Sequence, residues 1–457
     1  MKNKVKKYLF SLLFLAALDG CGKLVTVPPP VTQVTAAGAF SNDATAEATV
    51  AGLYSQIMSG GMFFLNGANT LYGGLSADEL YGTTPDAATD AFTNNSLLAD
   101  NPIVTTPLWE RAYSYLYVEN ACLEGIGGAG GVSETTKEKL SGEALFMRGL
   151  MLFYLTNLFG DIPLPLTTDY KDNAGLPRSD SATVYARIIA DLRDAEDRFR
   201  RSGMNDGPNR PGAAACEALL ARVYLYQKNW VQAANETDTV IGSGAYGIES
   251  LDAVFSAGNR EAIFSLVPVI PSLNTAEGLY FIPYDETSLP LYGITDALLA
   301  AFEEGDGRKS AWVGSQTVNG ITYAYPYKYK ARGSDAVTEN YVVLRLAEQY
   351  LIRAEARAHI GDLDGATEDI NTIRVRAGLL PLDRGLVADV LLSRIAGENR
   401  IEFFGEWGHR WLDLKRTGTA DEVLSRLKPG WKATDVLYPI PYSQLLLNPA
   451  LVQNKGY

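Results

Sequence analysis

Apolar side chains recur every three or four positions through long stretches of this 457-residue chain. The stretches 137–159 and 181–200 show the period most clearly, and 44–58 and 107–125 repeat it. In an α-helix this spacing places the apolar side chains on one face, which is then buried against another element. With 47% hydrophobic and 20% charged residues, the composition suits a globular protein with a sizeable core. The sequence therefore predicts a mainly α-helical fold.

Two pairs of predicted helices are each joined by only two residues. One pair spans 213–227 and 230–241, and the other spans 344–360 and 363–378. Small residues on the facing sides, such as Ala347 in the second pair, let the two helices approach closely. Pairs of this tetratricopeptide-like form cannot bury their apolar faces alone, so they stack on neighbouring pairs into a superhelical scaffold. The same pattern predicts two further pairs, 44–58 with 108–124 and 138–159 with 182–200.

Two segments, at about 59–105 and 250–335, lack the helical period. The first is rich in Gly, Asn, Thr and Tyr, and the second combines strand-like runs with long loops. Loops held by a rigid frame are where binding residues concentrate. Because no central linker is evident, we expect residues 41–457 to form a single domain. In this domain the two loop-rich inserts, which contain short strands, interrupt the helical scaffold.

Four tyrosines, Tyr323, Tyr325, Tyr327 and Tyr329, follow one another at a strict period of two. On a β-strand they project from one face. The row is either a platform on which a sugar or peptide stacks or the inner face of a hairpin that covers the helices. Because Tyr-Lys-Tyr leads directly into the scaffold, packing is favoured for Tyr327 and Tyr329. Both interpretations stay open for Tyr323 and Tyr325.

Aromatic side chains gather in both inserts, together with carboxylates and amides. Aromatic rings suit carbohydrate ligands because the C–H face of a sugar is apolar while its hydroxyls need polar partners nearby. For any one of these residues taken singly, packing or simple exposure remains the better explanation. The candidate ligand-binding residues are Tyr72, Asp78, Tyr81, Tyr280, Tyr284, Tyr292, Trp312 and Tyr323.

Residues 397–416, GENRIEFFGEWGHRWLDLKR, alternate charged and aromatic side chains more tightly than a solvated surface or an ordinary core does. We interpret the block as a buried network of ion pairs covered by aromatic rings. A catalytic alternative would use His409 as a general base, but no serine or cysteine nucleophile stands beside it in a recognisable motif. A second block, YPIPYSQLLLNPALVQNKGY at 438–457, follows at the end of the sequence.

Together the two blocks resemble the closing signature of the SusD/RagB family of outer-membrane nutrient-binding lipoproteins. The matching residues of the first block are Glu398, Arg400, Glu402, Phe403, Glu406, Gly408, Arg410, Trp411, Asp413, Leu414 and Arg416. Those of the second are Pro439, Ile440, Pro441, Asn448, Pro449, Gln453, Asn454, Gly456 and Tyr457. The departures are small: Asn399 stands where an acidic-basic run often continues, and Gln444 replaces the usual acid.

The resemblance implies a scaffold that binds oligosaccharide or polysaccharide at the cell surface through aromatic residues of the two inserts. It also implies a partner, a SusC-like TonB-dependent barrel in the outer membrane that receives the cargo, and no chemistry on that cargo. Two alternatives remain open. In one, the cargo is a peptide and the protein is the lid of a RagA-like transporter. In the other, the chain is a tetratricopeptide adaptor that binds only protein, although such repeats usually run without long inserts.

Residues 1–20 have the features of a lipoprotein signal peptide. Four lysines precede the apolar stretch 8–18, which is too short to span a bilayer of roughly 30 Å of hydrocarbon. Leu18-Asp19-Gly20-Cys21 then resembles a lipoprotein cleavage box, so lipid on Cys21 would anchor the protein in the outer membrane with its body exposed at the cell surface. A plain secretory signal is the alternative. Residues 21–40 are expected to be the lipidated cysteine and an extended tether.

Composition and motifs exclude several classes of function. A net charge of −13 argues against nucleic-acid binding, which depends on neutralising phosphates. Cys122 and Cys216 lie in predicted helices, so we expect buried free thiols and no disulfide. The sequence has no zinc, calcium or nucleotide-binding motif, so it predicts no metal and no cofactor beyond the lipid on Cys21. Adjacent carboxylates such as Asp285 and Glu286 point apart on a strand, unlike a glycosidase pair, and we expect no enzymatic activity.

Overall fold

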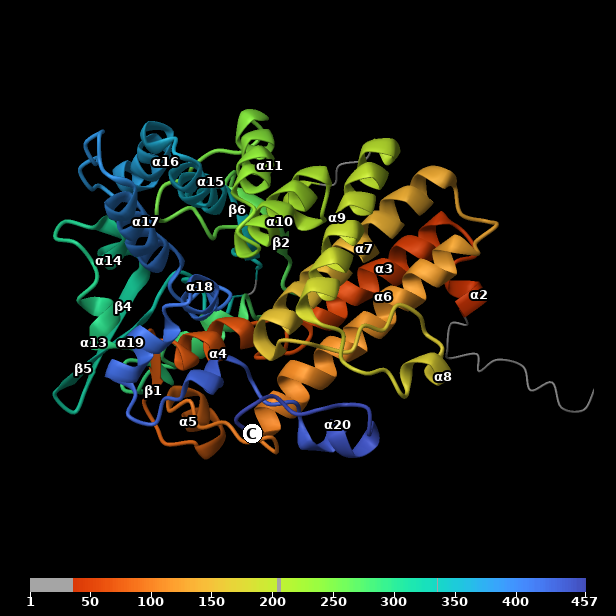
Figure 1. Cartoon of the computed structure of the whole chain (residues 1–457), viewed down its shortest axis with the longest axis horizontal. Coiled ribbons are helices and arrows are strands. Elements are labelled where there is room, and N and C mark those ends of the chain that lie inside the picture. The colour runs from red at the N-terminus through yellow and green to blue at the C-terminus, as the bar shows by residue number, and fades with distance from the viewer. Residues whose placement is uncertain (1–35, 204–206, 335) are drawn as a thin grey trace, which may run out of the picture.

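The computed structural model describes residues 36–203, 207–334 and 336–457, and it is mainly helical, as predicted (Figure 1). Four long helices form one half of the scaffold: α3 (Asp43–Met58), α6 (Arg111–Gly127), α7 (Glu134–Phe159) and α9 (Ser181–Ser202). Three of them begin where a side chain accepts a hydrogen bond from a backbone N–H three residues on, at Asn42, Ser133 and Asp180. Helix α9 ends at Gly203, whose φ of 62° favours glycine.

Helices α7 and α9 approach closely because α7 carries glycines on the facing side. A Cβ on Gly149 would lie 3.1 Å from Cδ2 of Leu192, and one on Gly142 would lie 3.0 Å from the ring of Phe199. Helix α3 packs on both α6 and α7. The apolar rows that defined the helical period are therefore buried between these four helices.

The two helix pairs with short connections stack on this half (Figure 1). The first is α10 (Ala213–Tyr226) with α11 (Trp230–Gly242), and the second is α15 (Leu346–Ile360) with α16 (Leu363–Arg376). Helix α11 lies against α15, where Trp230 stacks on His359 with ring centroids 3.9 Å apart. Gly361, with φ 91°, reverses the chain between α15 and α16. The tetratricopeptide-like pairs and their stacking are confirmed.

The charged and aromatic block forms a buried ion-pair network, as predicted. It folds into α17 (Ala388–Phe403) and α18 (His409–Thr417), which α19 (Ala420–Leu427) follows. The Arg345 guanidinium donates to Glu402 at 2.6 Å and to Glu406 at 2.9 Å, all three side chains being buried. The ring of Phe403 covers Arg345 at 4.3 Å and also stacks on His409 at 4.7 Å. Burial lowers the pKa of His409 well below its usual value, which leaves a neutral, enclosed ring.

The last block ties the C-terminal segment to α7. The side-chain amide of Asn454 donates to the carbonyls of Phe159 and Tyr438, at 2.8 and 2.7 Å. The side chain of Gln453 pairs with both backbone groups of Ile440, each at 2.8 Å. The amide residues of this block therefore hold backbone in place, which explains their spacing in structural terms.

Both inserts contain short helices and strands. The first contains α4 (Ala68–Ser76), β1 (Leu80–Gly82), α5 (Ala87–Thr93) and η1 (Val104–Glu110). The second contains β2 (Ala262–Leu266), α12 (Ala276–Phe281), β3 (Tyr292–Ile294), α13 (Asp296–Leu299), α14 (Gly307–Trp312), β4 (Val313–Val318) and β5 (Ile321–Pro326), and β6 (Tyr341–Arg345) follows it. The remaining short elements are α2 (Ala36–Ala39), α8 (Tyr170–Asn173), η2 (Gly207–Asn209), η3 (Ala433–Val436) and α20 (Tyr442–Leu447).

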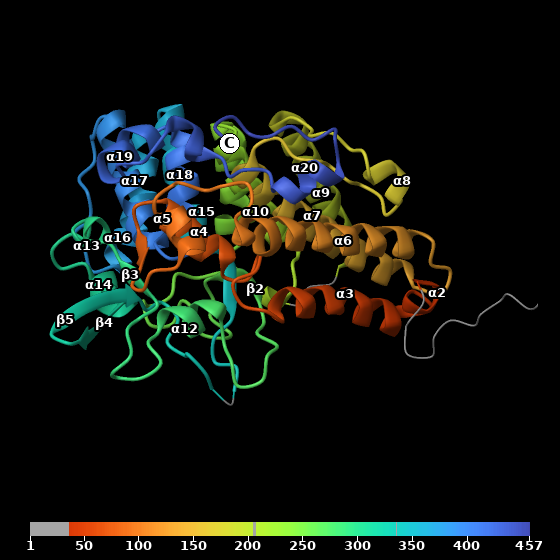
Figure 2. The same cartoon turned by 90° about the horizontal axis from the view of Figure 1, so that it is seen from below.

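Three two-stranded antiparallel sheets connect distant parts of the chain: β1–β3, β2–β6 and β4–β5. The β1–β3 sheet joins the two inserts, with Leu80 opposite Ile294. Strand β5 lies against β3, so the first insert is bordered by two strands of the second. Figure 2 shows α12 and the β4–β5 hairpin on the same side of the molecule, away from α20. Residues predicted from separate inserts are thereby brought together.

Cys122 and Cys216 are buried free thiols, as predicted. No helix within 36–203, 207–334 or 336–457 is long and apolar enough to cross a membrane. The predicted signal peptide at 1–20 and the predicted lipid site at Cys21 lie outside the described residues.

Candidate functional site

The β1–β3 sheet separates the predicted site residues into two groups. Successive side chains point to opposite faces of a strand, so Tyr81 of β1 and Tyr292 of β3 lie on opposite faces of the sheet. On one face, burial and then the phenol of Tyr323 raise the pKa of Tyr81, which places those two tyrosines near one another. On the other face, Tyr292 neighbours Tyr72 and Tyr280.

The group around Tyr72 packs largely against the scaffold. The side chain of Tyr72 is 7% exposed and lies tilted on Phe92 with ring centroids 4.7 Å apart. Tyr292 meets the ring of Phe281 edge-on at 6.3 Å. Burial, and then the phenols of Tyr292 and Tyr280, raise the pKa of Tyr72. Tyr280 and Tyr292 are half-buried and keep part of their rings open, whereas Tyr72 offers little surface to a ligand.

Trp312 belongs to the core, which contradicts the prediction that it contacts ligand. Its ring is fully buried, and its indole N–H donates to the carbonyl of Leu251 at 2.9 Å. The ammonium of Lys328 lies 4.4 Å from the ring centroid, and the guanidinium of Arg376 lies 5.4 Å from it. The ring thus covers cations of the buried network.

Asp78 is also held by the scaffold. Its carboxylate accepts from Nη2 of Arg400 at 2.7 Å and from Nε of Arg410 at 2.8 Å. Burial acts to raise the pKa of Asp78, but the hydrogen bond and charge of Arg410 and the charge of Arg400 outweigh it and lower the pKa. Both carboxylate oxygens are engaged, so Asp78 anchors the first insert to α17 and α18.

Tyr284 stands apart from the other candidates. Its ring is 75% exposed in the loop after α12, and the guanidinium of Arg332 lies 4.9 Å from the ring centroid. The pair is a loop contact at the surface, where a cation–π interaction is weak.

The row of four tyrosines divides at Pro326, where β5 ends. Tyr329 is buried and its hydroxyl accepts from the N–H of Val342 at 3.1 Å, so its predicted packing is confirmed. Tyr325 is buried against Tyr327, with ring centroids 5.9 Å apart. Tyr323 and Tyr327 are half-buried, and Tyr323 lies on the hairpin beside Tyr81.

A cavity of about 590 Å³, here called the insert pocket, opens beside Tyr81. Its walls come from the first insert, from the start of α13 and from the turn that follows α19. The lining residues are Ala77, Asp78, Leu80, Tyr81, Thr93, Asn94, Ser96, Thr295, Ala297, Leu427, Lys428, Pro429 and Gly430. An aromatic ring and aliphatic side chains thus share the walls with hydroxyl and amide groups.

Several polar groups of the insert pocket have no hydrogen-bond partner in the part of the chain that the structure describes. The hydroxyl of Thr93 is buried and makes no hydrogen bond among the described residues. Asn94 and Ser96 are exposed, and their side chains form no hydrogen bond with any described residue. The turn that presents them is held by Asn95, whose φ is 49° and whose side-chain amide donates to the carbonyl of Ser76 at 3.2 Å. The exposed side chains of Asn94 and Ser96 are available to a polar ligand.

Lys428 brings a titratable group to the insert pocket. Its ammonium donates to the carbonyls of Leu75 and Ser76, both at 2.7 Å. Burial lowers the pKa of Lys428 to about 7, against the opposing effect of the Asp78 charge. Glu79, next to Asp78, is buried, and burial followed by the Asp78 charge raises its pKa to about 8. The charge at this pocket therefore changes near neutral pH.

The sequence had pointed to Asp78, Tyr81 and Tyr323 but not to the polar residues around them. Thr93, Asn94 and Ser96 were missed because each is an unremarkable polar residue on its own. The polar run Asn94-Asn95-Ser96 was the available signal. Lys428-Pro429-Gly430 reads only as a turn, and nothing local links it to an insert more than 300 positions earlier.

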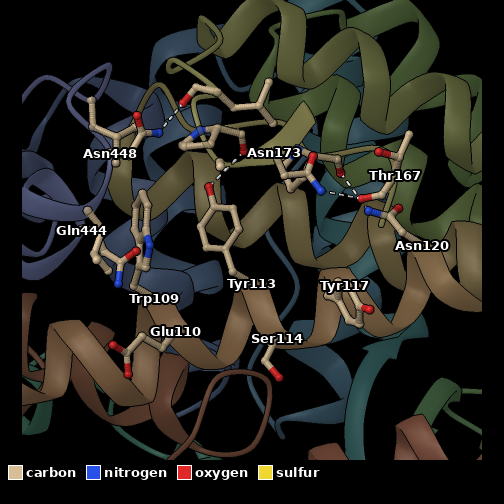
Figure 3. A pocket seen from close by; sticks show the side chains of 16 residues that line it. Trp109, Glu110, Tyr113, Ser114, Tyr117, Asn120, Thr167, Asn173, Gln444 and Asn448 are labelled. Atoms are coloured by element: carbon tan, nitrogen blue, oxygen red, sulfur yellow. Dashed lines mark hydrogen bonds between the residues drawn. The ribbon is translucent and has the colours of Figure 1, made fainter. Parts of the chain in front are cut away.

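A second cavity of about 540 Å³, which we call the α6 groove, lies between α6 and the segment 163–176 (Figure 3). One wall is α6 and the last two residues of η1, with Trp109, Tyr113 and Tyr117. The facing wall combines the segment 163–176 with α20 and the residues after it. None of the predicted site residues lines this groove.

Two family models match the chain. The model described as the SusD family, SusD_RagB, matches residues 306–457, and a model described as starch-binding associating with outer membrane matches residues 78–225. The chain belongs to the SusD/RagB family. The segment 306–457 contains the helix pair α15–α16 and both terminal blocks. The segment 78–225 contains α6, α7 and α9.

Curated SusD/RagB relatives align over nearly the full length. SusD-like protein P2 of Formosa agariphila is 26% identical over 99% of this chain and 100% of the relative. SusD-like protein P25 of the same organism is 22% identical over 92% of this chain and 93% of the relative.

Solved structures of the SusD superfamily share the fold. A SusD superfamily protein from Bacteroides vulgatus is 25% identical with a TM-score of 0.76, over 92% of this chain and 100% of that one. The surface glycan-binding protein A from Bacteroides fluxus is 25% identical with a TM-score of 0.73, over 91% of this chain and 99% of that one. A laminarin-binding SusD-like protein is 24% identical with a TM-score of 0.74, over 92% of this chain and 100% of that one.

Proposed function

We propose that this SusD/RagB protein binds oligosaccharide in the insert pocket, at the cell surface, and delivers it to a SusC-like TonB-dependent transporter in the outer membrane. The support for carbohydrate is the family, together with two structural relatives whose names specify glycan and laminarin. The protein acts as a binding component and performs no chemistry on its cargo. Release of reducing sugar from a glycan by the purified protein would overturn that part of the proposal.

The observation that carries the proposal is the combination of groups in the insert pocket. Tyr81, with Tyr323 nearby, supplies an aromatic face for the apolar side of a sugar ring. Asn94 and Ser96 supply exposed amide and hydroxyl groups without side-chain partners in the described structure. A sugar needs both kinds of contact at once, because leaving its hydroxyls unpaired on binding costs free energy.

The location and the transporter partner follow from family membership and from the N-terminal sequence. One matching family model is described as associating with the outer membrane. Cys21 follows a predicted signal peptide, so we propose that lipid on this residue anchors the protein.

The proposal is tested by calorimetric titration of the non-lipidated protein with a panel of oligosaccharides that includes laminari-oligosaccharides, and with peptides alongside. We expect at least one glycan to bind. Tyr81→Ala should weaken that binding about tenfold, which corresponds to about 1.4 kcal/mol for the loss of one stacking ring. Asn94→Ala, at an exposed position, should weaken it by less without affecting the fold.

Two control variants make the titration specific. Tyr170→Ala removes a 72% exposed ring that lies outside the insert pocket, and it should leave glycan affinity unchanged. Tyr284→Ala removes a candidate ring that is 75% exposed and also lies outside the insert pocket. Loss of binding in Tyr284→Ala but not in Tyr81→Ala would move the site to the loop after α12. Binding of peptides and of no glycan would contradict the proposed cargo.

A further inference from the structure

A third cavity of about 540 Å³, here called the cationic pocket, opens between the end of α7, α18 and the segment 453–455. Four cations line it, Arg178, Lys415, Arg416 and Lys455, against the single carboxylate of Asp161. The whole chain has a net charge of −13, so this excess of positive charge is a local feature.

Carboxylates neutralise one of these cations fully. The guanidinium of Arg416 pairs with Glu355 at 2.7 Å and with Asp413 at 2.6 Å. Arg178 and Lys415 form no ion pair with any residue that the structure describes. Their charges therefore need another explanation.

Part of that explanation is the last turn of α7. The ammonium of Lys415 donates to the carbonyl of Asn157, and the guanidinium of Arg178 donates to the carbonyl of Phe159 at 3.3 Å. A helix C-terminus attracts cations because it carries about half a negative charge. Two full positive charges exceed that amount, so their contact with the end of α7 does not compensate both.

Asp161 and Lys455 are the exposed charges of the lining, and they oppose one another. One carboxylate oxygen of Asp161 accepts from the N–H and from the hydroxyl of Ser181, at 2.9 and 3.0 Å. The ammonium of Lys455 makes no hydrogen bond with a described residue. With both counted, the cationic pocket still carries an excess of positive charge.

Lys415 is the cation that most clearly lacks compensation. Burial lowers its pKa to about 7, and no neighbouring charge opposes this effect. Its one hydrogen bond in the described chain, to Asn157, leaves two N–H groups of the ammonium for another acceptor. A bound anion would supply both the charge and the acceptor, which matters because an unpaired charge is costly to bury.

The walls of the cationic pocket also suit a sugar ring. The rings of Tyr185 and Tyr226 line it, and the hydroxyl of Tyr226 has no hydrogen-bond partner within 36–203, 207–334 or 336–457. Thr156 and Ser181 donate their hydroxyl protons to groups of the walls, at 2.9 and 3.0 Å, so their oxygens can still accept. A volume of about 540 Å³ lies in the range of small-molecule sites and is more than a simple inorganic anion needs.

We propose that the cationic pocket binds an acidic sugar through its carboxylate or sulfate group, which accepts hydrogen bonds from the ammonium of Lys415. Lys455 adds positive charge nearby, and the sugar ring lies beside Tyr226. The inference does not depend on glycan binding in the insert pocket, because the two pockets share no lining residue.

Calorimetric titration of the non-lipidated protein at low ionic strength tests the proposal with four probes: glucuronate, glucose sulfate, glucose and inorganic sulfate. We expect at least one of the two acidic sugars to bind and glucose, the matched neutral probe, to bind at least about tenfold more weakly. Lys415→Met keeps the length of the side chain and removes its charge. It should weaken binding of the acidic sugar at least about tenfold, because it removes a charge-assisted hydrogen bond.

Two exposed lysines give a comparison that does not depend on the folding of Lys415→Met. Lys455→Ala removes a charge from the lining and should weaken binding of the acidic sugar several-fold. Lys171→Ala removes an exposed lysine outside the cationic pocket and should leave this binding unchanged. Tyr226→Phe keeps the ring and should weaken binding several-fold, because it removes the free hydroxyl.

Failure of both acidic sugars to bind would overturn the proposal, even if neutral oligosaccharides bind in the insert pocket. Inorganic sulfate that binds as tightly as the acidic sugars would also overturn it, because the cationic pocket would then hold an adventitious ion only. Binding of acidic sugar that is lost in Tyr81→Ala and kept in both Lys415→Met and Lys455→Ala would place that ligand in the insert pocket instead.

Discussion

The insert pocket and the α6 groove have nearly the same volume, about 590 and 540 Å³, yet their polar groups are used differently. In the insert pocket, Thr93 and its neighbours have no partner among the described residues. In the α6 groove, Tyr113 and Asn448 donate to backbone carbonyls of the walls. Volume and aromatic content alone do not identify the ligand. The polar groups that remain unpaired distinguish a site for sugar from a groove whose polar groups already hold backbone.

The two cavities also differ in how they are anchored. The insert pocket rests on buried charges, because Asp78 connects the first insert to Arg400 and Arg410. The α6 groove is held by neutral hydrogen bonds such as that from Asn448 to Leu176. Removing one partner of a buried ion pair leaves an uncompensated charge, whereas removing one neutral hydrogen bond costs much less.

The largest expected effect comes from breaking the charged anchor. Asp78→Ala leaves two guanidinium groups without their carboxylate, so the free energy of unfolding should fall by about 3 to 5 kcal/mol. Asn448→Ala, the matched change in the neutral anchor, should lower it by about 1 kcal/mol. Urea denaturation of both variants measures the difference. Equal losses in the two variants would show that the anchors do not differ in the way the geometry indicates.

Most of the fold could be predicted from the sequence because its signals are local. The helical period of α7 and α9 and the two-residue connections of the helix pairs depend on neighbours a few positions apart. The charged block at 397–416 was interpretable for a similar reason: so many charges among aromatic residues within twenty positions fit a buried network best. The carboxylate of Glu402 and the guanidinium of Arg345 indeed meet inside the core.

The candidate site could be predicted only in part, because a tyrosine or tryptophan has the same identity in a core and in a pocket. Which face Tyr81 occupies depends on pairing between β1 and β3, more than 200 positions apart. Trp312 was predicted as a ligand contact. Its ring instead lies against Lys328 and Arg376, and its contact with Arg376 joins positions more than 60 residues apart in the sequence. Lys428 reached the insert pocket by the same kind of long-range contact.

An intermediate effect is expected from Thr93→Val, which tests the unpaired hydroxyl directly. Removing a buried hydroxyl that has no partner should raise the free energy of unfolding by about 1 to 2 kcal/mol. The same change should leave glycan affinity unchanged, because the buried hydroxyl does not reach the ligand. Thr156→Val is the matched control: its hydroxyl donates to the carbonyl of Gly160 at 2.9 Å, so that change should destabilise the protein.

Thermal unfolding and titration of Thr93→Val and Thr156→Val separate the two roles. A Thr93→Val protein that loses glycan affinity would mean that the hydroxyl reaches the ligand, whereas one that loses stability would mean that it serves the fold. The comparison between the two cavities would then lose the group that best distinguishes them.

The smallest expected effect is the pH dependence contributed by Lys428. Burial lowers its pKa from 10.5 to about 7 in the folded protein. Between these two values the unfolded chain carries a proton on Lys428 that the folded chain lacks, so stability should rise as pH increases through this window. Because the side chain is half-buried and keeps contact with water, we expect a rise of less than about 1 kcal/mol per pH unit.

Lys428→Met isolates this contribution, since Glu79 and the other groups that titrate near neutral pH remain in both proteins. The difference in free energy of unfolding between the unaltered protein and Lys428→Met should increase in favour of the unaltered protein from pH 7 to pH 9. Glycan affinity should vary less with pH in Lys428→Met than in the unaltered protein, because the charge of Lys428 lies in the wall of the insert pocket. A difference that stays constant with pH would place the ammonium in full contact with solvent, and the insert pocket would then resemble the α6 groove in lacking a group that titrates near neutral pH.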